Sequence, residues 1–255
     1  MKIVWIGAGN LATRVAFAMS EAGLTIVQVY SHTLPHAEAL AGLLGCEATN
    51  NLAEVRTDAD IYLFALKDTA LREAIARVRP NRGIWVHTAG SMPMDLFEGY
   101  AEHYGVLYPM QTFSKARPVD VSKVPIFVEG SDAETTERLM QLARHLSDSV
   151  QPLSSEKRKK LHLSAVFANN FVNHLYALAS DLLTEQDIDP ALLLPLIDET
   201  AAKVHDMTPR QAQTGPAVRY DENVIQKQLA QLDADPAKRQ IYALLSQSIH
   251  KHSLS

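Results

Sequence analysis

The chain opens with Lys2-Ile3-Val4-Trp5-Ile6-Gly7-Ala8-Gly9-Asn10-Leu11-Ala12, directly after Met1. The apolar run at residues 3–6 predicts a buried strand, and a helical pattern begins after Gly9. Gly7, Gly9 and Ala12 match a G-x-G-x-x-A turn, whose glycines permit a tight bend and a close approach to phosphate. Free N–H groups and the helix dipole would attract the pyrophosphate of a dinucleotide, although a tight turn without a ligand is an alternative. The residues expected to bind the nucleotide here are Gly7, Gly9, Asn10, Leu11 and Ala12.

Composition limits the classes of partner. The 255 residues suffice for one large or two moderate domains, and 47% hydrophobic with 21% charged residues is ordinary for a globular protein. A net charge of −5 provides no basic field for nucleic acid, and no apolar run is long enough to cross a bilayer. The local basic run Lys157-Arg158-Lys159-Lys160 is interpreted as a solvated turn at the start of a helix. We therefore expect neither a nucleic-acid nor a membrane partner.

The single cysteine, Cys46, excludes an internal disulfide and fits a reducing compartment. It has no Cys or His partners at metal-ligand spacing, so no metal site is predicted. The first strand begins almost at Met1, which leaves no room for a signal peptide in this sequence. We therefore expect a cytoplasmic protein.

Strand and helix patterns alternate up to about residue 150. Strands are predicted at residues 3–6, 25–30, 61–66, 83–87, 105–107 and 124–129. Helices are predicted at residues 10–22, 35–44, 68–78 and 133–146. This alternation indicates an α/β fold with a doubly wound parallel sheet.

The pattern becomes entirely helical after Pro152. Helices are predicted at residues 157–183, 190–204, 223–232 and 236–249, so we expect two domains, 1–152 and 153–255. The helix at 157–183 is rich in Leu, Ala and Phe and must bury more than one face, which could include a face against a partner subunit.

The end of the second predicted strand carries no Asp or Glu. An NAD enzyme usually places an acid there for the ribose 2′-hydroxyl, whereas this chain has Ser31, His32 and Thr33. These side chains can donate hydrogen bonds to a 2′-phosphate, which favours NADP over NAD. The alternative is a polar turn before Pro35.

Further residues are expected at the carboxyl edge of the sheet, where ligands of such folds bind. For the cofactor these are Ala65, Leu66, Lys67, His87 and Thr88. Ala89, Gly90 and Thr112 are expected to line the substrate site, the last within Tyr108-Pro109-Met110-Gln111-Thr112-Phe113. For His87 alone, a structural hydrogen bond is as good an explanation as a functional one.

The helical half supplies the remaining candidates. His162, Asn169, Asn170 and Asn173 fall near one face of the long helix, where a polar stripe either borders a cleft or forms a network between helices. We expect His162 to act as an acid or base and Asn170 to orient the substrate, with Asn169 lining the cleft. Thr214 is expected to line it too, and Arg219 could hold an anionic group or form a surface ion pair.

The motifs at residues 7–12, 87–90, 108–113, 162–170 and 214–216 together resemble a bacterial family of Rossmann-like NADP oxidoreductases with a C-terminal helical domain of unknown function. The resemblance covers essentially the whole chain. The family is similar in architecture to pyrroline-5-carboxylate reductase, deazaflavin-dependent NADP reductases, and 6-phosphogluconate and 3-hydroxyacid dehydrogenases. It implies a nucleotide-binding Rossmann domain, a helical domain of the 6-phosphogluconate dehydrogenase C-terminal type, and a homodimer.

The sequence departs from these relatives at two places. Hydroxyacid dehydrogenases carry a lysine four residues before the helix asparagine, and Val166 occupies that position if Asn170 is the asparagine. Tyr108 stands where the family usually has a histidine. The leading hypothesis is an NADP-dependent oxidoreductase that acts by hydride transfer on a small carbonyl, imine or hydroxyl compound. The alternatives are a non-catalytic NADP-binding regulatory or sensor protein and a protein that binds a nucleotide-sugar or a flavin-like ligand.

Overall fold

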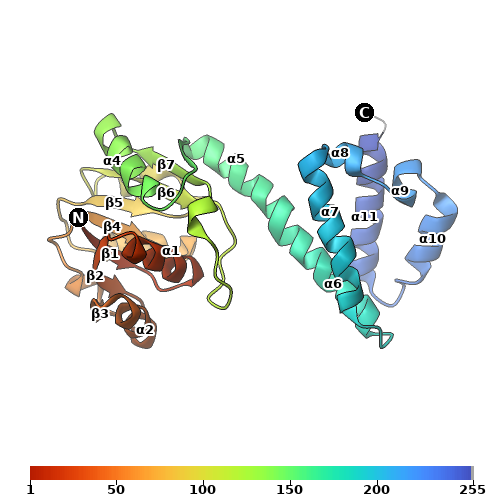
Figure 1. Ribbon diagram of the computed structural model, residues 1–255, viewed down its shortest axis with the longest axis horizontal. Coiled ribbons are helices and arrows are strands. Elements are labelled where there is room, and N and C mark those ends of the chain that lie inside the picture. The colour runs from red at the N-terminus through yellow and green to blue at the C-terminus, as the bar shows by residue number, and fades with distance from the viewer. Residues whose placement is uncertain (254–255) are drawn as a thin grey trace. The chain divides into compact units, whose positions relative to one another are not determined.

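The computed structural model describes residues 1–253 and divides into two compact units, Met1–Asn170 and Phe171–Ser255, which are described separately. In the described part of the first unit, the strands form one eight-stranded sheet in the order β3-β2-β1-β4-β5-β6-β7-β8 (Figure 1). The strands are β1 (Lys2–Ile6), β2 (Thr25–Tyr30), β3 (Glu47–Thr49), β4 (Ile61–Phe64), β5 (Ile84–His87), β6 (Tyr104–Pro109), β7 (Ile126–Gly130) and β8 (Val150–Pro152).

The predicted doubly wound parallel sheet is confirmed. The chain proceeds from β1 outward to β2 and β3, then returns to β4 on the other side of β1, so the strand order reverses between β1 and β4. One pair, β6 with β7, is antiparallel because the connection between them contains only the 3₁₀ turn η3 (Val121–Lys123) and no crossover helix. The strands β3 and β8 were not predicted, since three residues give too short a periodic signal.

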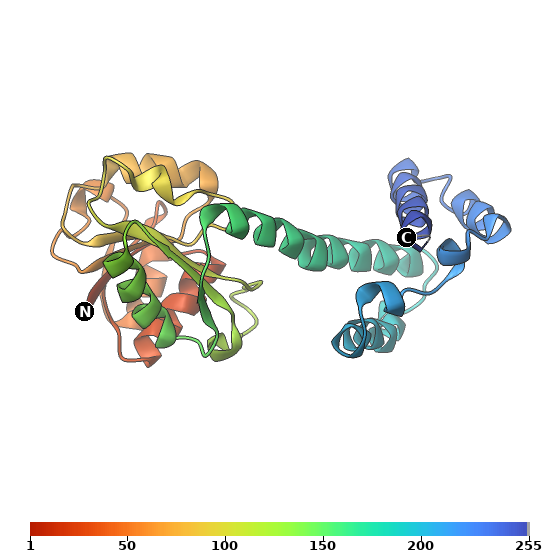
Figure 2. The ribbon, with the colours of Figure 1, turned by 90° about the horizontal axis from the view of Figure 1, so that it is seen from above.

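The helices of the first unit cover both faces of the sheet (Figure 2). Alternate residues of β1 enter two cores: Ile3 and Trp5 pack with α1, α2 and α4, whereas Val4 and Ile6 pack with α3 and two 3₁₀ turns. Gly45, with φ of 67°, ends α2 in the left-handed conformation that the sequence pattern suggests. The elements in these layers are α1 (Asn10–Glu21), α2 (Leu34–Leu44), α3 (Asp68–Arg77), α4 (Ala133–Arg144), η1 (Leu52–Glu54) and η2 (Met94–Phe97).

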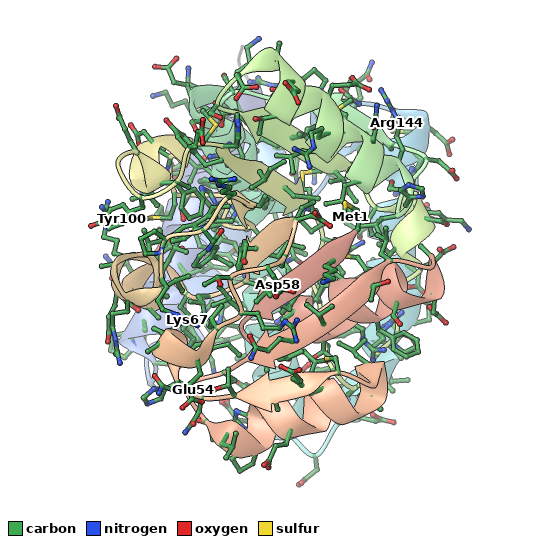
Figure 3. The ribbon with its side chains drawn as sticks, turned by 90° about the vertical axis from the view of Figure 1, so that its left-hand side faces the viewer. Met1, Glu54, Asp58, Lys67, Tyr100 and Arg144 are labelled. Atoms are coloured by element: carbon green, nitrogen blue, oxygen red, sulfur yellow. The ribbon has the colours of Figure 1, made fainter. Side chains whose placement is uncertain are left out.

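The two ends of the parallel strands differ in character. Figure 3 views the first unit from the side at which β1 begins, where Met1 and Asp58 are labelled. Asp58 pairs there with Lys2 Nζ at 3.0 Å and with Arg56 Nη2 at 2.9 Å, and all three side chains are partly exposed. The carboxyl ends of the parallel strands, where ligands of such folds bind, lie on the opposite side of the sheet.

Helical structure runs from Ser155 to Thr184, as the sequence predicts, but it is not uniform. The α-helix α5 (Ser155–Ala165) is followed by a π-helical segment, η4 (Val166–Phe171), and then by α6 (Val172–Thr184). The predicted boundary at residues 152 and 153 follows the last strand, whereas the compact units divide at residue 170. The domain assignment therefore stays a prediction.

The second unit is helical in its described residues, which confirms the predicted change of class. Among residues 1–253, no helix has the length and apolarity needed to span a membrane. The remaining elements of the second unit are η5 (Pro190–Leu193), α7 (Leu194–Asp206), α8 (Pro209–Ala212), α9 (Pro216–Arg219), α10 (Glu222–Ala230) and α11 (Pro236–Ser253).

Candidate functional site

The glycine turn lies at the point where the strand order reverses. Gly7 has φ of 123°, and a Cβ there would collide with the carbonyl oxygen of Ala65 at the end of β4. Its N–H donates to Tyr30 O at the end of β2 over 2.8 Å. The turn is thus held between the two strands that flank β1, and both the conformation and the close approach require glycine. This is the crevice in which doubly wound folds bind their ligands.

The N-terminus of α1 fits a bound pyrophosphate. Gly9 is the N-cap residue, no side chain caps the helix, and the first turn contains no acidic residue. Among the described atoms, none outside its own neighbourhood lies within 4 Å of a Cβ built on Gly9. The amides of the first turn therefore lack a side-chain partner and lie beside open space, which is the arrangement that binds phosphate groups.

The other predicted cofactor residues lie at the ends of the flanking strands. Ser31 is nearly buried and donates its N–H to Thr49 O, whereas His32 and Thr33 are exposed. Thr33 is the N-cap of α2 but its hydroxyl makes no capping hydrogen bond, so it is available to a ligand. At the end of β4, Ala65 is half-buried and Lys67 is exposed. These groups follow the two strands that flank the glycine turn, and their contact with a ribose or a pyrophosphate stays a prediction.

His87, at the end of β5, has a structural role in this conformation. Its ring is fully buried, Nδ1 accepts the N–H of Ala89 at 3.2 Å, and Nε2 therefore carries the proton and donates to Pro93 O at 3.2 Å. Burial, together with the charge of Arg158, lowers the pKa of His87 to about 4, so the ring is neutral at pH 7. Both ring nitrogens are used within the loop, and a direct contact of His87 with the cofactor stays a prediction.

His162 lies against the loop that follows β5. Gly90 is buried, and a Cβ built there would come within 2.5 Å of His162 Nδ1. The same nitrogen is 3.0 Å from the hydroxyl of Tyr108 at the end of β6, and the two rings meet edge to face with centroids 5.9 Å apart. Residues from β6, α5 and the β5 loop therefore converge, and the roles predicted for Gly90 and His162 in the substrate site stay predictions.

Arg158 fixes the start of α5 and was misinterpreted from the sequence. Lys157, Lys159 and Lys160 are exposed, but Arg158 is fully buried. Its guanidinium donates to Glu129 Oε2 on β7 and to Met92 O in the β5 loop, each at 2.6 Å. Because Arg158 precedes His162 by one helical turn, this anchor sets where His162 lies. In the sequence, the available signal was the spacing of four residues between Arg158 and His162, which places both on one face of a helix.

The buried ion pair shapes the local electrostatics. Burial alone would raise the pKa of Glu129, but hydrogen bonds from Ser155 and Arg158 outweigh it and hold that pKa below its usual value. Burial raises the pKa of the Tyr108 phenol, an effect that Arg158 partly offsets. Tyr108 is therefore a neutral hydrogen-bond donor at physiological pH.

A pocket of about 380 Å³ opens beside the Tyr108 and His162 pair, within the size range of small-molecule sites. It brings together the predicted Thr112, His162, Asn169 and Asn170. It does not include Asn173, nor the predicted Ala89 and Gly90. Its lining residues are Tyr108, Met110, Gln111, Thr112, Leu161, His162, Ser164, Ala165, Val166, Ala168, Asn169 and Asn170.

The π-helical segment supplies part of the pocket wall. Val166, Ala168, Asn169 and Asn170 all belong to η4. Single π turns inside α-helices occur often at functional sites, because the extra residue changes which side chains share a face. Helical periodicity of the sequence gives no signal for such a turn. Thr214 precedes α9 and Arg219 ends it, both in the second unit, so their part in the site stays a prediction.

Comparisons with known proteins agree with this geometry. A family model described as "putative NAD(P)-binding" matches residues 1–97, and a model for a domain of unknown function, DUF2520, matches residues 124–249. A solved structure from Bacteroides fragilis, described as a "putative NADP oxidoreductase", is 50% identical with a TM-score of 0.92 over 98% of both chains. The chain therefore belongs to this family of Rossmann-type NAD(P)-binding proteins with a DUF2520 domain, as the resemblance in the sequence predicted.

More distant structures share the fold. Pyrroline-5-carboxylate reductase from Streptococcus pyogenes is 11% identical, with a TM-score of 0.64 over 98% of both chains. A reductive aminase from Aspergillus terreus, solved with NADPH and ethyl-5-oxohexanoate, is 17% identical, with a TM-score of 0.67 over 99% of this chain and 92% of that one. A comparison with curated protein sequences found no significant match.

Proposed function

We propose that this protein is an NADP-dependent oxidoreductase that acts on a small carbonyl, imine or hydroxyl compound. The observation that carries the proposal is the Tyr108 and His162 pair, 3.0 Å apart, packed against Gly90 at the carboxyl edge of the sheet that also bears the glycine turn. Membership in a family that includes a "putative NADP oxidoreductase" supports the redox class. When bound, NADPH supplies a hydride, and the chain supplies binding, orientation and a proton.

The preference for NADP rests on the end of β2. His32 and Thr33 are exposed there, and no carboxylate follows Tyr30 to bind a ribose 2′-hydroxyl or to repel a 2′-phosphate. Lys67, exposed at the end of β4, adds a cation at the same edge. The arrangement therefore favours the additional phosphate of NADP.

The proton and the substrate are assigned to the pocket residues. His162 acts as the acid or base. The hydroxyl of Tyr108 can pass the proton between His162 and the substrate, because His162 Nδ1 and Tyr108 Oη are in hydrogen-bonding contact. Asn170 orients the substrate through its amide, with Asn169, Thr112 and the Ala89-Gly90 backbone around it. The pocket lining includes Val166 and contains no lysine, so lysine takes no part in this scheme.

The second unit is proposed to pair with a second copy of the chain as a homodimer. Among its described residues, four are buried: Ala217, Ile225, Leu229 and Ser246. Large apolar side chains are exposed instead, with Leu192 at 71%, Leu196 at 64% and Leu244 at 65%. Such a unit buries too little apolar surface to be stable without a partner surface.

A cytoplasmic location is part of the proposal and rests on cysteine usage. Burial, with a smaller contribution from Glu47, raises the pKa of Cys46 to about 11, so the thiol stays protonated and unreactive. A lone inert thiol fits a reducing compartment.

A second candidate function is an NADP-dependent sensor without turnover. The observation that favours it is the pocket lining, which includes Val166 and contains no lysine. A sensor would keep the glycine turn and the NADPH affinity but reduce no substrate.

NADPH oxidation with a panel of aldehydes, ketones and imines, and NADP⁺ reduction with a panel of hydroxy acids, distinguish the two functions. We expect turnover on one class of compound, and a loss of at least tenfold in kcat in His162→Ala. His145→Ala changes an exposed histidine at the end of α4 and serves as the matched control. Tight NADPH binding without turnover on any compound, and no effect of His162→Ala, would establish the sensor instead.

A further inference from the structure

The pocket beside Tyr108 and His162 is lined without a permanent charge. None of its twelve lining residues is Lys, Arg, Asp or Glu. Its polar groups are hydroxyls, amides and one imidazole, and its apolar groups include Met110, Leu161 and Val166. We propose that the substrate is an uncharged carbonyl compound with an apolar substituent, interconverted with its alcohol, rather than an imine, an amine or a compound bearing a carboxylate or phosphate. This inference rests on the proposed function and narrows its substrate class.

The buried charges beside the pocket are paired with each other and are not available to a ligand. Arg158 lies one turn before His162, but its side chain is 1% exposed and its guanidinium is paired with Glu129 and Met92 O. The cation and the carboxylate of this pair offset each other. Lys157, Lys159 and Lys160 are exposed and are not among the residues that line the pocket. The exposed Arg117 lines an adjoining pocket, which shares Gln111 and Thr112 with this one.

A charged ligand that enters the pocket would lose part of its hydration without gaining a counter-ion from the lining. Moving a carboxylate or an ammonium group out of water costs several kcal/mol unless an opposite charge or several hydrogen bonds replace the water. A carboxylate would need an arginine or lysine, and a protonated imine or amine would need an aspartate or glutamate. The lining contains neither.

An uncharged carbonyl matches the groups that are present. Its oxygen needs one or two donors, which the Tyr108 hydroxyl and the amides of Asn169 and Asn170 provide. Those two amides make no hydrogen bond through their side chains to other residues of the described chain, so they are free to meet a ligand. An apolar substituent would contact Met110, Leu161 and Val166.

The reaction balances with the groups named. The carbonyl carbon gains a hydride from reduced nicotinamide dinucleotide, the C=O π bond breaks, and its electron pair moves to the oxygen. The oxygen takes a proton from the Tyr108 hydroxyl, which recovers it through His162 from solvent. The carbonyl is reduced to an alcohol, and the dinucleotide is oxidised.

Matched ring compounds test the inference by binding, independently of turnover. Cyclohexanone, methyl 4-oxocyclohexanecarboxylate, 4-oxocyclohexanecarboxylate and cyclohexylamine are titrated calorimetrically into the full-length protein saturated with NADP⁺. We expect the two uncharged ketones to bind at least about tenfold more tightly than the carboxylate and the ammonium compound, a difference of about 1.4 kcal/mol. The ester controls for size, because it carries the same substituent without the charge.

Two charge variants test whether the pocket itself is responsible. Val166→Lys in η4 and Thr112→Lys in the loop after β6 each place a cation in the lining, and each should improve binding of 4-oxocyclohexanecarboxylate about tenfold. Gln141→Lys on the exposed face of α4 adds the same net charge elsewhere and should change nothing.

The outcomes are distinguishable from those of the proposed function. Binding of uncharged ketones without their reduction would refute the oxidoreductase and leave this inference standing. Preferred binding of the carboxylate or of cyclohexylamine to the unmodified protein would overturn the inference, as would a failure of all four compounds to bind.

Discussion

Gly90 and His162 are in direct contact, and a Cβ on residue 90 would come within 2.5 Å of the imidazole Nδ1. Gly90→Ala should therefore displace the His162 ring and break its hydrogen bond to Tyr108. We expect at least a tenfold loss of kcat, a cost of about 1–3 kcal/mol in unfolding free energy, and an unchanged NADPH affinity. Gly42→Ala is the control: it lies in α2 with open space around it and should be neutral or stabilising. Equal kcat values for Gly90→Ala and Gly42→Ala would show that the contact between Gly90 and His162 does not contribute to catalysis.

Tyr108 should matter through its hydroxyl. Tyr108→Phe keeps the buried ring but removes the group that contacts His162 Nδ1, so kcat should fall about tenfold or more while KM changes less than about threefold. Because burial raises the phenol pKa, the activity of the unmodified protein should show no loss from Tyr108 ionisation below pH 10. Tyr100→Phe, at a side chain that is 48% exposed, provides the matched control. A large rise in KM with unchanged kcat would assign Tyr108 to binding alone.

Removing the charge of one partner in the ion pair between Arg158 and Glu129 should strongly lower the free energy of unfolding. Glu129→Gln leaves the guanidinium buried without a counter-charge, and we expect a loss of about 3–5 kcal/mol in unfolding free energy, measured by urea denaturation. Arg77→Ala, which breaks the exposed pair with Glu73, should cost less than about 1 kcal/mol.

The same pair predicts a pH dependence. The folded-state pKa of Glu129 is lowered, so its stabilisation is present above the ordinary carboxyl pKa and is lost as the pH falls through the folded value. Glu129→Gln should remove that part of the acid dependence. An acid profile of the variant that is identical to that of the unmodified protein would show that the pair contributes none of it.

His87 should stay neutral far below the usual histidine range. Burial lowers its pKa from 6.5 to about 4, so the unfolded chain binds the proton more readily than the folded chain between these values. This difference in proton binding leaves the free energy of unfolding unchanged above pH 6.5. It lowers that free energy by roughly 3 kcal/mol as the pH falls to about 4. In an NMR titration, the His87 ring should not titrate above pH 5. Titration of His87 near pH 6.5 would contradict its burial and its hydrogen bonds.

The sequence was most informative where one residue type is required by backbone geometry. Gly7 and the uncapped start of α1 follow from the motif, and the order of strands and helices follows from periodicity, because both signals are local. Gly90 and His162 were both predicted for the site, but the contact between them depends on how α5 packs on the sheet.

Non-local interactions account for what the sequence did not predict. The burial of Arg158 depends on Glu129 and Met92, which are distant in the chain, so a basic run gave the wrong interpretation. The π-helical segment η4 and the antiparallel strand β7 likewise depend on packing and on a missing crossover helix, for which single-residue propensity carries little information.

The most direct test of the oxidoreductase follows the hydride itself. The protein is incubated with cyclohexanone and with NADPH deuterated on either face of the nicotinamide C4, and the alcohol is analysed by mass spectrometry. The account predicts one deuterium at the former carbonyl carbon, from one face only, and at least tenfold less product with Tyr108→Phe. NADPH that binds tightly while no label reaches cyclohexanone, or any other member of the carbonyl and imine panel, would contradict it.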